Sequence, residues 1–197
     1  MERISGHESR AAGLAYTGIF VVVMAVCSWI SIPLTIPVTL QTFGVFAAVG
    51  LLGGKRGTLA VLVYILMGAA GLPVFSGFAG GPGALLGTTG GYIAGFVFSA
   101  LLMWGMERMF GRSLPVLAVS MVLGLLVCYG VGTAWYMAVY AGTSGQIGLM
   151  TVLGWCVFPF VLPDLVKIGL ALALAGTLLY ENAGSEMIRK LSAAFRW

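Results

Sequence analysis

Asp164 and Lys167 are ionisable residues three positions apart inside a long apolar stretch of the chain. At this spacing two residues of a helix lie on the same face, with their Cβ atoms about 5–6 Å apart. An ionisable side chain inside a membrane span costs about 2.5–3.5 kcal/mol on insertion scales, so such residues usually serve a function. We therefore predict that the pair anchors a small molecule. The alternative is an ion pair that only holds helices together, and such pairs often contribute little net stability.

The composition is that of an integral membrane protein surrounded by lipid. The chain has 197 residues, of which 60% are hydrophobic and 8% charged, and its mean hydropathy is +1.05. A soluble domain is about 45–50% apolar and about 25% charged. Runs such as residues 20–25 do not alternate apolar and polar side chains, which excludes a β-barrel. The net charge of +4 does not indicate nucleic-acid binding, because the basic residues are scattered in small groups.

The apolar runs predict an all-α integral membrane protein, a compact bundle of six transmembrane helices. The chain is one transmembrane domain, residues 1–197, with polar tails at 1–10 and 184–197. The predicted spans cover about 14–30, 39–52, 58–70, 91–106, 114–140 and 163–181. Pro163 is placed in the first turn of the last helix, where a proline is tolerated. Residues 149–160 are then a partly buried lead-in, and the glycine-rich stretch 74–91 is a long uncharged loop.

The basic residues predict the orientation of this bundle. All of the ten lysines and arginines except Lys167 fall in the two tails, the turn at 55–56 and the turn at 108–112. With six spans these four segments lie on one side of the membrane. Cytoplasmic segments carry the excess of Lys and Arg, so both termini are predicted to be cytoplasmic. The pair at 164 and 167 then lies toward the outer surface.

The spans contain no recognisable catalytic arrangement. The single histidine, His7, lies in the N-terminal tail, and Asp164 has no second intramembrane carboxylate beside it. There is no Walker A motif, so the chain cannot energise transport itself. The three cysteines lie in apolar runs without CxxC spacing, which does not favour a metal site. We expect neither an enzyme nor a bound cofactor.

Three segments in order carry a specific pattern. They are Ile36-Pro37-Val38-Thr39-Leu40-Gln41-Thr42-Phe43, then Gly71-Leu72-Pro73-Val74-Phe75 through Gly87-Thr88-Thr89-Gly90-Gly91-Tyr92, and Pro163-Asp164-Leu165-Val166-Lys167. Together they resemble the BioY-type biotin transporters, the substrate-binding S components of energy-coupling factor (ECF) transporters. The resemblance implies a six-helix protein of the bacterial plasma membrane that binds biotin from outside with high affinity. It also implies two kinds of partner, a transmembrane T component and two ATP-binding-cassette ATPase subunits.

The resemblance suggests how the pair would be used. The ureido ring of biotin has two N–H groups flanking one carbonyl, so Asp164 would accept an N–H and Lys167 would donate to the oxygen. The further substrate-binding residues that we expect are Gln41, Thr42, Gly90, Gly91 and Tyr92. The first four are candidates for the carboxylate end of biotin, and Tyr92 for packing on its rings. The alternative for Gln41 is a structural hydrogen bond at the start of a helix, and the alternative for Tyr92 is an anchor at the membrane interface.

Two other functions fit the same residues. The first alternative is a standalone ion-coupled carrier for biotin or another small vitamin, in which Asp164 would be a proton site. It is also compatible with a non-transporting assembly factor, from which no ligand would co-purify.

Overall fold

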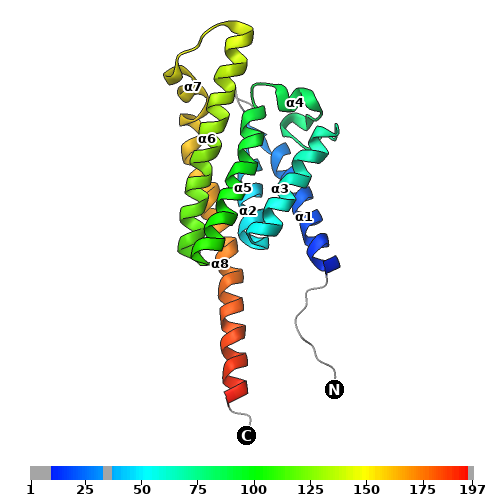
Figure 1. The fold of residues 1–197 in the computed structure, drawn as a ribbon, viewed down its shortest axis with the longest axis vertical. Coiled ribbons are helices and arrows are strands. Elements are labelled where there is room, and N and C mark those ends of the chain that lie inside the picture. The colour runs from blue at the N-terminus through cyan, green and yellow to red at the C-terminus, as the bar shows by residue number, and fades with distance from the viewer. Residues whose placement is uncertain (1–9, 33–36, 195–197) are drawn as a thin grey trace.

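The computed structural model describes residues 10–32 and 37–194, with side chains for 11–32 and 37–180. The described residues form a helical bundle with one short two-stranded sheet (Figure 1). The elements are α1 (Arg10–Trp29), β1 (Ser31–Ile32), β2 (Val38–Thr39), α2 (Gln41–Leu52), α3 (Gly54–Ala69), the 3-10 turn η1 (Ser76–Phe78), α4 (Pro82–Leu86), α5 (Gly90–Phe110), α6 (Leu114–Ser144), α7 (Leu149–Cys156) and α8 (Phe158–Ala194). Residues 1–9 and 195–197 of the two predicted tails and the motif residue Ile36 lie outside the described residues.

The six predicted spans correspond to α1, α2, α3, α5, α6 and α8. Four of these, α1, α5, α6 and α8, contain stretches long and apolar enough to cross a membrane. The helices α2 and α3 have 12 and 16 residues, which is shorter than the roughly 20 residues that a full span needs. The outer faces of the bundle are apolar, as lipid contact requires: on α1, Leu14, Ile19 and Val22 are 65%, 54% and 61% exposed.

The two turns that carry the predicted charged clusters lie at the same end of the bundle, where α1 also begins (Figure 1). Glu107 accepts a 2.6 Å hydrogen bond from the Gly54 N–H at the start of α3. Arg112 donates to the carbonyls of Gly50 and Leu51 at the end of α2, at 2.8 and 2.9 Å. A carboxylate thus lies at a helix N-terminus and a guanidinium at a helix C-terminus, where each complements the helix dipole. These contacts hold the α2–α3 corner against the α5–α6 corner.

The predicted start of the last helix was wrong. Helix α8 begins at Phe158, so Pro159 lies in its first turn and Pro163 lies inside it. Pro159 satisfies the local rule, because the first four N–H groups of a helix have no intrahelical partner. Pro163 lies beyond those positions and removes one i→i−4 hydrogen bond from α8. The break in the backbone falls at Val157, with φ −126° and ψ −59°, after α7. Asp164 therefore lies beyond the first turn, and most of the predicted lead-in is helical.

The predicted loop at 74–91 also contains helical structure, namely η1 and the short helix α4. It is held to the bundle by Ser28, whose hydroxyl donates a 2.6 Å hydrogen bond to the Val74 carbonyl. Trp29 donates from its indole N–H to the Pro73 carbonyl at 2.8 Å. The segment is thereby fixed over one end of α1 and α3, opposite the charged turns (Figure 1).

Two groups of buried apolar side chains surround the interior of the bundle. The larger group joins α1, α2, α3, α5, α6 and α8 and includes Met24, Phe46, Tyr64, Met103 and Met121. The smaller group joins α6, α7 and α8 and includes Tyr136, Val152, Cys156 and Phe160. The half-buried Tyr92 and Tyr129 pack against both groups. The polar cavity described next lies where the two groups meet.

Candidate functional site

A cavity of about 90 Å³ lies inside the bundle. Its lining includes Cys156 of α7 and Thr89, which follows α4, and these two helices lie at the same end of the bundle (Figure 1). The cavity is lined by residues of the β2–α2 segment, of the connection between α3 and α5 (residues 71–89, called the 71–89 segment below) and of helices α5, α6, α7 and α8. The lining residues are Pro37, Thr39, Gln41, Thr42, Ser76, Thr89, Tyr92, Ile93, Phe96, Leu125, Cys128, Tyr129, Cys156, Phe160, Asp164 and Lys167. The three segments singled out in the sequence therefore meet at one cavity.

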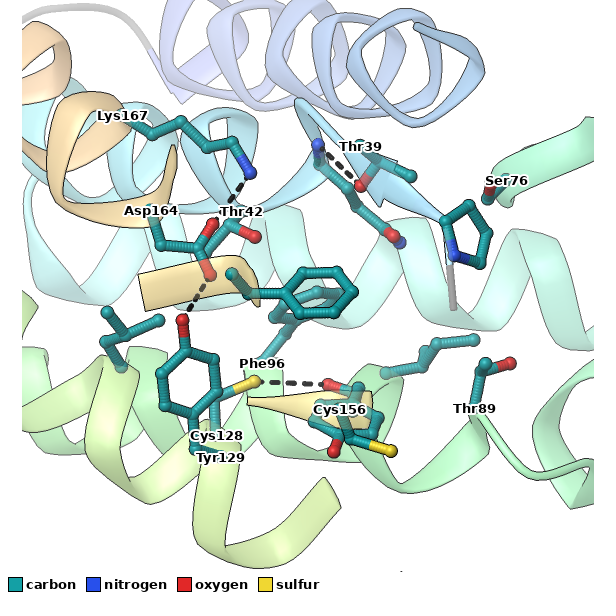
Figure 2. Close-up of a pocket in the computed structure, with 16 residues that line it drawn as sticks. Thr39, Thr42, Ser76, Thr89, Phe96, Cys128, Tyr129, Cys156, Asp164 and Lys167 are labelled. Carbon is teal, nitrogen blue, oxygen red and sulfur yellow. Dashed lines mark hydrogen bonds and ion pairs between the residues drawn. The ribbon is translucent and has the colours of Figure 1, made fainter. Parts of the chain in front are cut away.

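Asp164 and Lys167 form a buried ion pair in the wall of this cavity. Their side chains are 4% and 5% exposed, and Lys167 Nζ lies 2.7 Å from Asp164 Oδ1. The second carboxylate oxygen, Oδ2, accepts a 2.6 Å hydrogen bond from the hydroxyl of Tyr129 (Figure 2). Both oxygens of Asp164 thus have a donor. Such charge-assisted hydrogen bonds are about twice as strong as neutral ones and hold the carboxylate in one orientation.

Sequence reasoning missed Tyr129, which α6 brings beside α8. A tyrosine inside an apolar span needs a hydrogen-bond partner for its hydroxyl, and that requirement was the available signal. Nothing local in the sequence identifies Asp164 as the partner, because the two residues are 35 positions apart. The contact exists only once α6 and α8 are packed together.

Gln41 lies at the start of α2 and is buried. Its amide nitrogen Nε2 donates a 2.8 Å hydrogen bond to the Tyr64 hydroxyl, which in turn donates to the Val74 carbonyl at 2.8 Å. The backbone N–H of Gln41 donates to Thr39 Oγ1 at 3.1 Å. Gln41 therefore both lines the cavity and ties α2 to α3 and to the 71–89 segment. The neighbouring Thr42 also lines the cavity.

Tyr92, in the first turn of α5, lines the cavity with its ring against α6. A Cβ added at Gly132 would lie 2.2 Å from the Tyr92 ring, so the ring packs directly on the backbone there. The Tyr92 hydroxyl lies 3.5 Å from Thr133 Oγ1. The Cys128 thiol donates to the Tyr92 carbonyl, with the sulfur and oxygen 3.6 Å apart (Figure 2). These contacts hold an aromatic surface facing the cavity.

Gly90 and Gly91 are not among the residues that line the cavity. A Cβ at Gly90 would lie 1.7 Å from the Leu85 carbonyl oxygen, and one at Gly91 would lie 2.1 Å from Trp135 Cβ. Both glycines allow the start of α5 to approach its neighbours closely. The structure therefore gives them a packing role, and it separates them from the five other residues that the sequence suggested.

Within the described residues no group of three or more His, Cys, Asp or Glu side chains converges as a metal site would require. The ionisable side chains of the cavity wall are instead the ion pair and the tyrosine and cysteine groups around it. This arrangement offers one acceptor and one donor, both charged, beside aromatic and apolar side chains. It is the chemistry of a binding site for a small molecule with polar and apolar parts.

Replacing Tyr129 with Phe is expected to weaken ligand binding by about tenfold to a hundredfold, because a hydrogen bond to a charged group contributes about 1.5–3 kcal/mol. The change removes the Tyr129 donor from Asp164 Oδ2 and leaves the ring in place. A calorimetric titration of the purified variant measures the effect. Tyr140→Phe, on the same helix but outside the cavity lining, is the matched control. Equal affinities for the two variants would show that Tyr129 does not support the site.

Comparison with known proteins agrees with this geometry. The family model described as the BioY family matches residues 2–182. The "Biotin transporter BioY" of Thermotoga maritima is 41% identical over 155 residues, which cover 78% of each chain. The "Probable biotin transporter BioY" of Pyrococcus horikoshii is 38% identical over 167 residues, covering 84% of this chain and 95% of that one.

A solved structure has the same fold. It is the crystal structure of "the S-component for biotin from an ECF-type ABC transporter", with a TM-score of 0.78 and 25% sequence identity. The match covers 89% of this chain and 95% of the other. The family model spans most of the chain, and the relatives are similar over most of their length. This chain therefore belongs to the BioY family.

Proposed function

We propose that the chain binds biotin with high affinity and takes it up across the cell membrane as the S component of an ECF transporter. The observation that carries this proposal is the buried pair of Asp164 and Lys167 in the wall of the cavity. The comparisons support the same proposal, because the relatives are named as biotin transporters and the solved structure is that of a biotin S component.

The ureido ring of biotin matches the pair. It has two N–H donors flanking one carbonyl acceptor, so an N–H donates to Asp164 and the carbonyl accepts from Lys167. Tyr129 keeps the carboxylate of Asp164 oriented for this contact. Tyr92 and Phe96 provide aromatic surface for the bicyclic rings in the same cavity. Gln41 and Thr42 complete the proposed contact residues, whereas Gly90 and Gly91 act through packing.

The volume of the cavity implies movement on binding. At about 90 Å³ it is smaller than the roughly 300–1,000 Å³ of typical small-molecule pockets. A ligand with two fused rings and an acyl chain therefore needs the wall to move outward. Val74 and Phe75 anchor the start of the 71–89 segment in the core. The later part of the segment supplies Ser76 and Thr89 to that wall, and neither η1 nor α4 within it contains a buried residue. Residues 76–89 are therefore the part we expect to move.

The proposed membrane arrangement has six spans, with both termini in the cytoplasm and the cavity toward the outside. The contacts at the charged turns support one common end for the basic clusters. The short helices α2 and α3 would cross the membrane as a buried pair within the bundle. The membrane is the bacterial plasma membrane, and the energising partners are a T component and two ATPase subunits.

The test is to purify the full chain and examine it by mass spectrometry for bound biotin, followed by calorimetric titration of the ligand-free protein. We expect stoichiometric biotin and a dissociation constant in the nanomolar range, that is about −12 kcal/mol. Absence of bound biotin together with no heat on titration would contradict the proposal and favour an assembly factor.

Biotin uptake by cells with and without the T component and ATPases then distinguishes the transport modes. Uptake by the chain alone that an uncoupler abolishes would indicate the ion-coupled carrier.

A further inference from the structure

The charged side chains of the cavity are gathered at one end. Asp164, Lys167 and Tyr129 lie together, and Ser76 and Thr89 lie at the opposite end of the same cavity (Figure 2). Lys167 is the only lysine or arginine among the residues that line the described cavity. Its ammonium is 2.7 Å from Asp164, so the pair as a whole carries no net charge. The far end of the cavity holds only neutral polar groups.

Among the residues whose side chains the structure describes, no other basic group is placed to reach that far end. The sequence has no lysine or arginine at 11–54, 57–106 or 113–166. Arg112 is engaged with the Gly50 and Leu51 carbonyls at the other end of α2. The guanidinium of Arg56 lies beside Gly13, near the start of α1. Both therefore lie at the charged end of the bundle.

The far end instead offers hydroxyl groups. No hydrogen bond within the described part of the chain engages the hydroxyl of Ser76 or of Thr89. Thr39 Oγ1 accepts from the Gln41 N–H, which leaves its own O–H hydrogen to be donated elsewhere. A hydroxyl both donates and accepts, so it forms a hydrogen bond with a carboxylate, an amide or an ester. The bond to the carboxylate is about twice as strong as the bonds to the neutral groups, which is a smaller difference than the loss of an ion pair. A cation would pair strongly with the carboxylate alone.

We infer that this site binds the acyl end of its ligand through neutral hydroxyl groups, so that its ligands include amides and esters of the acid as well as the acid itself. The inference rests on the proposed function, because it takes biotin as the acid and the Asp164–Lys167 pair as the contact for the ureido ring. No cation is paired with the carboxylate of a ligand at the far end. Conversion of that carboxylate to an amide therefore breaks no ion pair. Recognition then depends on the ureido end, and the charge of the acyl end is not selected.

The test is a titration of the purified, ligand-free full chain with biotin, biotinamide and biotin methyl ester. We expect the three dissociation constants to agree within about tenfold, which corresponds to 1.4 kcal/mol. Tight binding of biotin with more than about a hundredfold weaker binding of both derivatives would overturn the inference, because that loss is typical of a broken charge pair. It would leave the proposed function standing. Failure of biotin itself to bind would overturn both.

Substitutions that add a cation test the position of the acyl end. Ser76→Lys and Thr89→Lys each place an ammonium at the far end of the cavity, and at least one should raise the preference for biotin over biotinamide by about tenfold or more. Thr88→Lys is the matched control, because Thr88 is exposed and does not line the cavity. An unchanged preference in both cavity variants, or the same rise in the control, would contradict the assignment of the acyl end to this part of the cavity.

Discussion

Asp164→Asn is expected to lower the affinity for biotin by about two to three orders of magnitude, the usual effect of truncating one member of a buried charge pair. The amide removes the charge that would accept the ureido N–H. It also removes the anion that lies 2.7 Å from the Lys167 ammonium, and the Lys167 side chain is only 5% exposed. Calorimetric titration of the purified variant measures the loss.

The buried lysine complicates this single substitution, because an unpaired buried charge also destabilises the fold by about 3–5 kcal/mol. The double variant Asp164→Asn with Lys167→Met separates the two effects. It removes both charges together, so stability should return toward that of the unsubstituted chain while biotin binding stays lost. Thermal unfolding and titration of the same preparation report the two quantities. Recovery of binding in the double variant would show that the pair only holds the helices together.

Gly90→Ala is expected to destabilise the protein by about 1–3 kcal/mol, the typical result of overpacking. The new Cβ would lie 1.7 Å from the carbonyl oxygen of Leu85 and 2.5 Å from its carbonyl carbon. Because these are backbone atoms, no side-chain rotation relieves the overlap, and the start of α5 must move away from α4. The midpoint of thermal unfolding, followed by tryptophan fluorescence in detergent, measures the change.

Gly105→Ala is the matched control, since Gly105 lies in the same helix and a Cβ there meets nothing within 4 Å. Alanine is favoured over glycine in a helix by about 1 kcal/mol, so this variant should be as stable as the unsubstituted chain or more so. A Gly90→Ala variant that unfolds normally but fails to bind biotin would support a direct ligand contact instead. That outcome would restore the role that the sequence motif suggested for this glycine.

Local pattern was sufficient for most of the helices. Hydrophobic runs predicted the regions of α1, α5 and α6, because a helix satisfies its own backbone hydrogen bonds and needs only apolar side chains to face lipid. The local sequence pattern was insufficient at the start of α8, because either Pro159 or Pro163 is acceptable in the first turn of a helix. Packing of Val152, Cys156 and Phe160 against α6 decides which proline begins the helix.

The sequence by itself determined the ion pair, since residues three apart on one helix share a face whatever surrounds them. It also determined the grouping of the basic residues, and its three motifs indicated which segments meet. Only the tertiary structure decided that Tyr129 contacts Asp164, that Gly90 and Gly91 pack closely against Leu85 and Trp135, and that hydroxyl groups occupy the far end of the cavity. The physical reason is distance along the chain. A hydrogen bond between α6 and α8, or a backbone contact between α4 and α5, depends on how the helices are placed in space, which no local spacing of residues encodes.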